Sequence, residues 1–330
     1  MIIETSAPTR MDVAGGTVDI WPLYLYHRNA LTVNVAIDIP ARCRVSARSD
    51  RHFFLRSRDT GESVQLGSLD ELWSSQVLKL LSKLIYFFTP VGGLEMETHC
   101  MAPAGSGLAG SSALNIAICG ALNELTGAGY SLEALIQIAR NVEAQVIDVP
   151  TGEQDYYPAA YGGVEAIHFT AGGVRREVLR CDANRLSERL ILIYSGRQRN
   201  SGINNWEVMK RHIDGDRDIY RAFEGIVEAA NRMRQALCSG DFNLIDEALD
   251  LEWANRKVLS DGITTPEIEE IVAKARLLGA GAAEVCGAGG GGCLMMAVPE
   301  GRRQEIQAKL LQQGVQVIDY KIAQQGLMIR

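Results

Sequence analysis

The pattern of hydrophobic and polar positions divides the chain into short β-branched runs and longer stretches with an apolar residue every three or four positions. The short runs predict strands, and the longer spacing predicts amphipathic helices. In the first half, strands are expected at residues 2–7, 32–37, 42–47, 94–102 and 164–169. Helices are expected at residues 69–84, 114–125 and 132–147. The segment Ala7-Pro8-Thr9-Arg10 is expected to end or bend the first strand.

From residue 190 onward, strands and helices alternate. Strands are expected at 190–194, 293–298 and 315–320, and helices at 218–237, 243–259, 265–279 and 301–313. This alternation indicates a second α/β lobe. A length of 330 residues fits one large domain or two ordinary ones, and a hydrophobic content of 47% fits a globular protein with a substantial core.

Charge and composition narrow the classes of function. A net charge of −7 does not support a nucleic-acid-binding surface. No apolar run has the length of a membrane span, and an N-terminus that contains Glu4 and Arg10 does not look like a signal peptide. The seven cysteines are scattered singly, without CxxC or Cys/His spacing, which argues against a zinc site and for a reducing cytoplasm.

A glycine- and serine-rich stretch opens directly into the helix expected at 114–125. It contains Pro103, Gly105, Ser106, Gly107, Leu108, Ala109, Gly110, Ser111 and Ser112. Glycines let the backbone curl closely around a ligand, and the start of a helix presents unpaired N–H groups and the positive end of a dipole. The stretch therefore predicts a phosphate site, with serine hydroxyls that can hold a phosphate oxygen or a hydrated Mg²⁺.

The same stretch has a simpler interpretation as a turn followed by a helix cap. Two common nucleotide-binding motifs are excluded. A Walker A loop needs a lysine after its last glycine, and none follows here. The glycine spacing also differs from that of a dinucleotide fingerprint.

Arg10 and Asp19 lie nine residues apart, with Gly15-Gly16 between them. The two glycines can turn the chain so that the cation and the carboxylate face one place. The alternative is a surface loop with a weak ion pair.

Two acidic residues follow the glycine-rich stretch. Glu143 falls on the apolar side of the helix expected at 132–147, and a buried carboxylate is costly unless a cation meets it. Either Arg140 or a lysine pairs with it, or a metal ion does. Asp155 lies in a turn-rich segment twelve residues later. Two such carboxylates near a phosphate loop suit Mg²⁺ binding and proton handling, and the alternative is a pair of solvent-exposed loop acids.

A second glycine-rich loop, Gly287–Gly292, precedes the strand expected at 293–298. Its four consecutive glycines cost backbone entropy, which favours close contact with a ligand or with the first loop. The polar run 195–202 is expected to form a mobile loop. Arg197 and Arg199 in this run could reach a phosphate, although surface arginines are common.

Three motifs, Ala7 to Asp19, Pro103 to Ala113 and Gly287 to Gly292, resemble in order and spacing those of the GHMP kinases, the superfamily of galactokinase, homoserine kinase, mevalonate kinase and phosphomevalonate kinase. The first motif is similar to the branch of D-glycero-D-manno-heptose kinases and L-fucokinase-type sugar kinases. The resemblance implies an α+β fold with two lobes. Residues 1–185 would form a ribosomal-protein-S5-domain-2-like domain, and residues 186–330 a ferredoxin-like domain.

The resemblance also implies a role for each matched residue. The glycine-rich stretch 103–112 would wrap the phosphates of ATP, and Ser112 and Glu143 would ligate Mg²⁺. Asp155 would be the catalytic carboxylate, held by Arg10. The implied substrate-binding residues are Gly16, Asp19, Asp155, Tyr161, Gly289 and Gly290. Glu284 departs from the pattern, because relatives often have lysine there.

The implied function is ATP-dependent transfer of a phosphoryl group to a hydroxyl of a sugar or sugar phosphate. The implied protein is a cytoplasmic monomer or homodimer without nucleic-acid or membrane partners. Two alternatives stay open: a mevalonate-type isoprenoid kinase, and a catalytically silent nucleotide- or sugar-binding protein. The galactokinase signature is absent from the sequence, so galactose is not the first choice of substrate.

Overall fold

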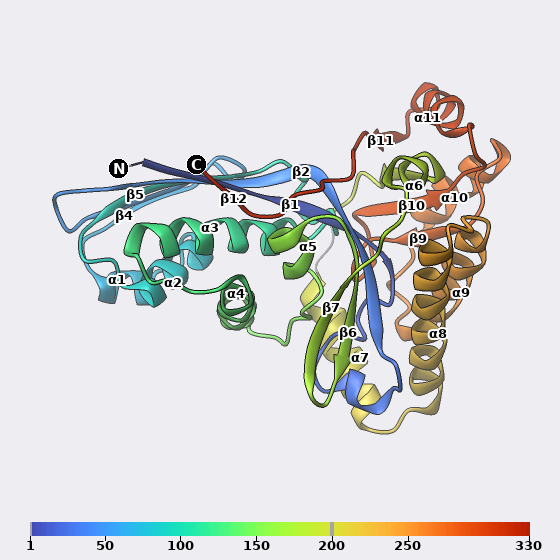
Figure 1. Cartoon of the computed structure of the whole chain (residues 1–330), viewed down its shortest axis with the longest axis horizontal. Coiled ribbons are helices and arrows are strands. Elements are labelled where there is room, and N and C mark those ends of the chain that lie inside the picture. Colours follow the sequence, from blue (N-terminus) through green and yellow to red (C-terminus); the bar gives the residue numbers. More distant parts are fainter. Residues whose placement is uncertain (1, 199–200) are drawn as a thin grey trace.

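The computed structural model describes residues 2–198 and 201–330, apart from the side chains of residues 201–204. Within these residues the larger sheet has eight strands, in the order β12-β1-β2-β5-β3-β4, with β6 paired to β2 and β7 to β6 (Figure 1). Its strands are β1 (Ile2–Ala14), β2 (Leu31–Ala47), β3 (Phe53–Ser57), β4 (Ser63–Leu66), β5 (Leu94–Cys100), β6 (Val164–Thr170), β7 (Gly173–Val178) and β12 (Met328–Ile329).

Helices cover one face of the larger sheet (Figure 1). They are α1 (Leu69–Ser74), α2 (Lys79–Phe88), α3 (Gly110–Thr126), α4 (Leu132–Ile147) and α5 (Tyr156–Tyr161). The central helix α3 packs on β1 and β2 and is flanked by α2 and α4. Because it contacts neighbours on several sides, α3 is buried from Ser112 to Leu122. This burial fixes the position of the loop that precedes α3.

The smaller sheet is antiparallel, in the order β11-β8-β10-β9. Its strands are β8 (Leu190–Tyr194), β9 (Ala283–Val285), β10 (Cys293–Ala297) and β11 (Gln316–Ile318). The remaining helices are η1 (Leu23–Tyr26), α6 (Ala183–Arg189), α7 (Ser201–Ile213), α8 (Arg217–Ser239), α9 (Leu244–Leu259), α10 (Pro266–Leu277) and α11 (Arg303–Gln312). Helix α8 packs against β1 and β2, and α9 packs against β1, β9 and β10. This helix pair therefore joins the two sheets.

The expected α+β class is confirmed, with two sheets and helices packed on each. Several strands of the described residues are absent from the list expected from the sequence, among them β7 and β12. β7 forms a hairpin with β6, and β12 at the end of the chain pairs with β1 (Figure 1). The division of the chain at residue 185 falls inside α6 and stays a prediction. Within the described residues, no helix combines the length and the apolar composition that crossing a membrane requires.

Ala7 to Arg10 was expected to end or bend the first strand, and of these alternatives the structure contradicts only the end of the strand. β1 continues to Ala14, and its pairing with β2 shifts register between Ala7 and Thr9. Pro8 has no N–H to donate, and a β-bulge is one of the few places where a strand tolerates proline. The continuous strand carries Arg10 and Asp12 from the sheet into the region where the two sheets meet.

The single helix expected at 69–84 is two helices, α1 and α2. The break falls at polar residues whose hydroxyls compete with the helix for backbone groups. Ser74 Oγ donates to the carbonyl oxygen of Asp70 at 3.0 Å, and Ser75 Oγ donates to that of Val77 at 2.8 Å. The apolar period continued across these serines, which is why the sequence pattern concealed the break.

Candidate active site

A cavity of about 450 Å³ lies where separate segments of the chain meet. Asp59-Thr60 and Asn205 line part of it, and four further segments supply the rest. The first is the end of β1 with the turn that follows it, and the second is the glycine-rich loop before α3. The third runs from the end of α4 to Asp155, and the fourth is Gly287-Ala288. Three of these segments are the motifs that the sequence singled out, although more than 270 residues separate the first from the last (287 − 10 = 277).

The loop 103–112 wraps one end of the cavity and leads into α3. Gly105 and Gly107 have φ angles of +66° and +82°, which favour glycine. A Cβ on Gly107 would lie 2.2 Å from the carbonyl oxygen of Cys286, so no larger residue fits. The predicted phosphate-binding residues line the cavity. Leu108 is the exception, because its side chain is buried in the apolar core.

The loop Gly287–Gly292 packs directly against the first loop. The backbone N–H of Cys293 donates to the carbonyl oxygen of Ser106 at 2.6 Å. A Cβ on Gly292 would lie 2.6 Å from the same oxygen. The expected close approach of the two glycine-rich loops is therefore confirmed, and it keeps the first loop in its curled conformation.

Glu143 is a buried carboxylate held by hydroxyl groups. Its side chain accepts hydrogen bonds from Ser111 Oγ at 2.6 Å, Ser112 Oγ at 3.2 Å and the Tyr156 hydroxyl at 2.6 Å. Burial raises the pKa of Glu143, and the bonds from Ser111 and Tyr156 oppose the rise without cancelling it. A nearby cation would stabilise the ionised form of such a carboxylate, because its charge is desolvated and incompletely compensated.

The expectation that Arg140 pairs with Glu143 is not met. Arg140 forms an ion pair with Glu153, which is 4% exposed and belongs to the segment after α4. Arg140 precedes Glu143 by three residues on α4, but its guanidinium points to Glu153 in the segment after the helix. Among the described side chains, no ion pair to Glu143 is present and its partners are three hydroxyl groups, so the metal-ion alternative stays a prediction.

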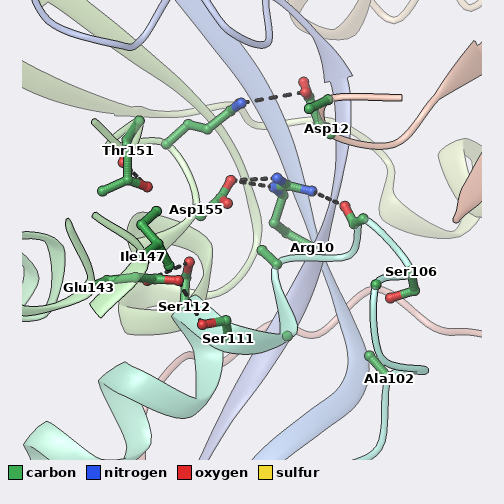
Figure 2. A pocket seen from close by; sticks show the side chains of 18 of the residues that line it. Arg10, Asp12, Ala102, Ser106, Ser111, Ser112, Glu143, Ile147, Thr151 and Asp155 are labelled. Atoms are coloured by element: carbon green, nitrogen blue, oxygen red, sulfur yellow. Dashed lines mark hydrogen bonds and ion pairs between the residues drawn. The ribbon is translucent and has the colours of Figure 1, made fainter. Parts of the chain in front are cut away.

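Arg10 and Asp155 form the centre of the cavity (Figure 2). Arg10 is 2% exposed, and its Nε donates to Asp155 Oδ1 at 2.9 Å. Its Nη1 donates to the carbonyl oxygen of Gly107 at 2.7 Å, which ties the pair to the phosphate loop. Burial lowers the pKa of Arg10, but the charges of Asp155 and Asp12 and the hydrogen bond to Asp155 together outweigh burial and leave that pKa above its ordinary value. Both bonds to Asp155 go to Oδ1, which leaves Oδ2 for a ligand.

Asp19 reaches the same cavity from the turn after β1, as expected from Gly15-Gly16. Its Oδ2 accepts a hydrogen bond from the backbone N–H of Gln154 at 3.0 Å. A Cβ on Gly152 would lie 2.0 Å from this oxygen, so the glycine makes room for the carboxylate. Burial and the nearby charge of Asp155 raise the pKa of Asp19 to about 7.

A buried ion network behind the cavity was not among the predictions made from the sequence. Arg256 of α9 is 1% exposed and lies 3.3 Å from Asp12 Oδ2, 2.9 Å from Glu252 Oε1 and 3.1 Å from Glu284 Oε1. Its Nη1 also donates to the carbonyl oxygen of Gly287 at 2.5 Å. Burial lowers the pKa of Arg256, but the three carboxylates outweigh burial and raise it. One guanidinium thus ties the first motif to the third, and only the i,i+4 spacing of Glu252 and Arg256 hinted at it.

Comparison with known proteins agrees with this geometry. The family description of the GHMP kinases N terminal domain matches residues 74–163, and that of the GHMP kinases C terminal region matches residues 233–316. The chain belongs to the GHMP kinases.

Similar proteins include other members of this family. The chain is 26% identical to the D-glycero-alpha-D-manno-heptose 7-phosphate kinase of Campylobacter jejuni, over 98% of both chains. It is 28% identical to the L-fucokinase/L-fucose-1-P guanylyltransferase of Bacteroides fragilis, over 89% of this chain and 34% of that protein. The fold matches that of a D-glycero-D-manno-heptose 1-phosphate kinase from Bacteroides thetaiotaomicron with a TM-score of 0.81 and 21% identity, over 99% and 98% of the chains.

Gly289 and Gly290 were expected to contact the substrate, but neither is among the residues that line the cavity of this GHMP kinase. The backbone N–H of Gly290 donates to the carbonyl oxygen of Ile263 at 2.7 Å, and a Cβ on Gly289 would lie 2.7 Å from the same atom. The glycine run curls against the loop that contains Ile263, so these two residues support the site from outside.

Gly16 and Tyr161 are also outside the lining of the cavity, in contrast to the expectation. A Cβ on Gly16 would lie 2.1 Å from both Asp12 Oδ2 and Arg256 Nη2, so this glycine leaves room for the ion network. The hydroxyl of Tyr161 donates to Glu133, and the guanidinium of Arg176 lies over its ring. Spacing along the chain could not show that these neighbours of site residues face elsewhere.

Arg197 does not line the cavity either. Its guanidinium pairs with Glu267 of α10 at 2.5 Å. Arg199 lies outside the described residues.

Proposed function

We propose that this GHMP kinase transfers the γ-phosphoryl group of ATP to a hydroxyl group of a sugar or sugar phosphate. The observation that carries the proposal is the single cavity in which the Arg10–Asp155 pair lies next to the glycine-rich loop and Glu143. The names of the similar heptose phosphate kinase and L-fucokinase support a sugar as the acceptor.

Phosphoryl transfer depends mainly on positioning and on stabilisation of charge. The backbone N–H groups of loop 103–112 and the start of α3 would hold the phosphates. Asp155 Oδ2 would orient the acceptor hydroxyl and accept its proton as the oxygen attacks the γ-phosphorus. Arg10 would stabilise the negative charge on the transferred group, because it is already fixed beside Asp155.

Ser112 and Glu143 would hold the Mg²⁺ that accompanies ATP. Glu143 fits this role because it is a buried carboxylate that is surrounded by hydroxyls and has no compensating charge beside it among the residues that the structure describes. Carboxylate and hydroxyl oxygens are suitable ligands for Mg²⁺, which usually takes one or two protein ligands and completes its shell with phosphates and water. When bound there, the ion would neutralise charge on the β- and γ-phosphates.

Replacement Ser112→Ala is expected to raise the Mg²⁺ concentration needed for half-maximal activity by about tenfold or more. The reason is the loss of one oxygen ligand next to the phosphates. Ser111→Ala is the matched comparison, because Ser111 also bonds Glu143 but is not the proposed ligand, and it should shift the titration less. A Mg²⁺ titration of the Ser112 variant identical to that of the unmodified enzyme would argue against the assignment.

The pH profile of acceptor use is expected to follow Asp19. Its carboxylate would accept hydrogen bonds from substrate hydroxyls, and burial raises its pKa to about 7. Since the proton must leave before the carboxylate can accept, kcat/KM for the sugar should fall roughly tenfold per pH unit below that value and level off above it. In Asp19→Asn the limb near pH 7 should disappear. A profile of the variant that keeps the same limb would assign it to another group.

The proposed function can be tested with a coupled assay that monitors the release of ADP. The assay is run over a panel of free sugars, sugar phosphates and mevalonate. We expect ADP release with at least one sugar or sugar phosphate. Turnover with mevalonate alone would identify an isoprenoid kinase. Binding of ATP without turnover on any acceptor would indicate a silent binding protein.

The expected cytoplasmic location stays a prediction. The expected monomer or homodimer stays a prediction.

A further inference from the structure

The end of the cavity away from the glycine-rich loop contains buried oxygen atoms that no described group satisfies. Asp12 is 1% exposed and Gln154 is 5% exposed, and both line the cavity. Asp12 Oδ1 and Gln154 Oε1 each have no hydrogen-bond partner among the described residues. A buried acceptor without a donor is costly, so two of them beside one cavity point to a ligand that donates hydrogen bonds.

The orientation of both side chains is fixed by the protein itself. Asp12 Oδ2 lies 3.3 Å from Arg256 Nη2, and it accepts from Gln154 Nε2 at 3.4 Å. Because the amide nitrogen is engaged with Asp12, the carbonyl oxygen of Gln154 is the atom left over. In the view of Figure 2, the Arg10–Asp155 pair lies between Asp12 and the cluster of Glu143 with Ser111 and Ser112. Under the proposed function, Asp12 would therefore lie on the acceptor side of the reacting group.

The charges of the described residues around this end of the cavity disfavour a second phosphate group. Asp12, Asp19 and Asp155 line it with three carboxylates. Of the residues that the structure describes in the lining, the only cation is Arg10. Its guanidinium is already committed to Asp155 and to the carbonyl oxygen of Gly107. A phosphate ester carries close to two negative charges and needs arginine, lysine or backbone donors, and at this end it would meet oxygen acceptors instead.

We propose that Asp12 and Gln154 form a subsite that accepts hydrogen bonds from the hydroxyls of an unphosphorylated sugar, and that this kinase discriminates against phosphate esters of the same sugar. The inference rests on the proposed function and narrows it. It differs from the relatives whose names specify a heptose phosphate, because it assigns to this chain a neutral polyol as acceptor.

The first test compares kcat/KM for free sugars with kcat/KM for their phosphate esters, using mannose, fucose and sedoheptulose as free sugars. We expect at least one free sugar to be used more than about 100-fold better than its ester, since a site built for hydroxyl donors rejects a misfit group strongly. Preference for the ester would overturn the inference and leave the sugar-kinase function intact. Preference for an amino sugar over its neutral parent would also overturn it. Failure of every sugar and sugar phosphate would count against the proposed function as well.

The second test is Asp12→Asn, which keeps the shape of the side chain and replaces an acceptor oxygen by a donor. KM for the sugar should rise about 10- to 100-fold, while KM for ATP should change less than about twofold, because one hydrogen bond to a charged group is lost at the acceptor end only. Monodeoxy sugars supply the specific readout. For the sugar that lacks the hydroxyl bound by Asp12, the variant and the unmodified enzyme should have similar KM values.

Glu252→Gln is the matched control for Asp12→Asn. Glu252 also pairs with Arg256 and is fully buried, but it does not line the cavity. If Asp12 acted only by holding Arg256 in place, the two variants would raise KM for the sugar equally and no deoxy sugar would cancel the effect. That outcome would overturn the assignment of Asp12 to the substrate. A KM rise confined to Asp12→Asn, cancelled by one deoxy sugar, supports it.

Discussion

Replacement Asp155→Asn is expected to lower kcat by about 10²- to 10⁴-fold while ATP still binds. The asparagine keeps the shape of the side chain and its contact with Arg10, but it cannot accept the proton of the acceptor hydroxyl. The carboxylate suits this role because its side chain is 28% exposed to the cavity, while the arginine that orients it is buried. Single-turnover phosphoryl transfer, measured together with ATP binding by calorimetry, separates the chemical step from binding.

Asp148→Asn is the matched control for this variant. Asp148 is 81% exposed at the end of α4, pairs with Lys79 and does not line the cavity. Its substitution removes one carboxylate from the same region of the surface and should leave kcat within about twofold, since exposed ion pairs contribute little. Near-normal turnover by Asp155→Asn would remove Asp155 from the reaction. Loss of ATP binding in that variant would assign it to the nucleotide site instead.

Replacement Arg256→Met is expected to destabilise the fold by about 3–5 kcal/mol, because it leaves the buried carboxylates of Asp12, Glu252 and Glu284 without their shared cation. A loss of this size corresponds to a fall of roughly 5–15 °C in Tm. The loss should be larger at pH 8 than at pH 5. Burial already raises the pKa of Glu252 to about 7 in the presence of the guanidinium, so at low pH protonation relieves the repulsion and at high pH it cannot.

Two further variants give this prediction its controls. Arg232→Met on α8 removes an arginine that is 50% exposed and pairs with Glu228, so its Tm should fall by no more than about 2 °C. Addition of Glu252→Gln and Glu284→Gln to Arg256→Met should restore part of the lost Tm, since it removes two of the uncompensated charges. If Arg256→Met melts like the unmodified enzyme at pH 8, or if the added glutamines lower Tm further, packing rather than charge holds this region together.

The network around Arg256 also explains a departure in the sequence. By sequence, Glu284 was only a departure from the pattern of the family that the chain resembles. In the structure its side chain lies 3.1 Å from Arg256 Nε, and burial raises its pKa well above the usual range. The cation that joins the first and third motifs is thus provided by α9. A lysine at position 284 would face Arg256 at close range, so the two positions are expected to change together.

The elements that could be predicted from the sequence are those whose signals are local. The helix expected at 132–147 matches α4, and the helix expected at 265–279 matches α10 within two residues at each end. Glu143 could be recognised as buried because its neighbours on the helix were apolar. The same reasoning failed at Ser74 and Ser75, where side-chain hydrogen bonds to the backbone interrupt a helix although the helical spacing of apolar residues continues. It also failed at Pro8, where a bulge lets the strand continue.

What the sequence by itself determined is the list of chemical parts: a glycine-rich phosphate loop, two acids, an arginine and a second glycine run, in an order that resembles the GHMP kinases. Which of these parts meet was decided by the tertiary structure. Arg10 and Asp155 are 145 residues apart, and Arg140 turned out to pair with Glu153 rather than Glu143. Ion pairs and cavity linings join residues that are distant along the chain. Only the packing of β1, α3, α9 and the glycine loops brings them within a few ångströms of one another.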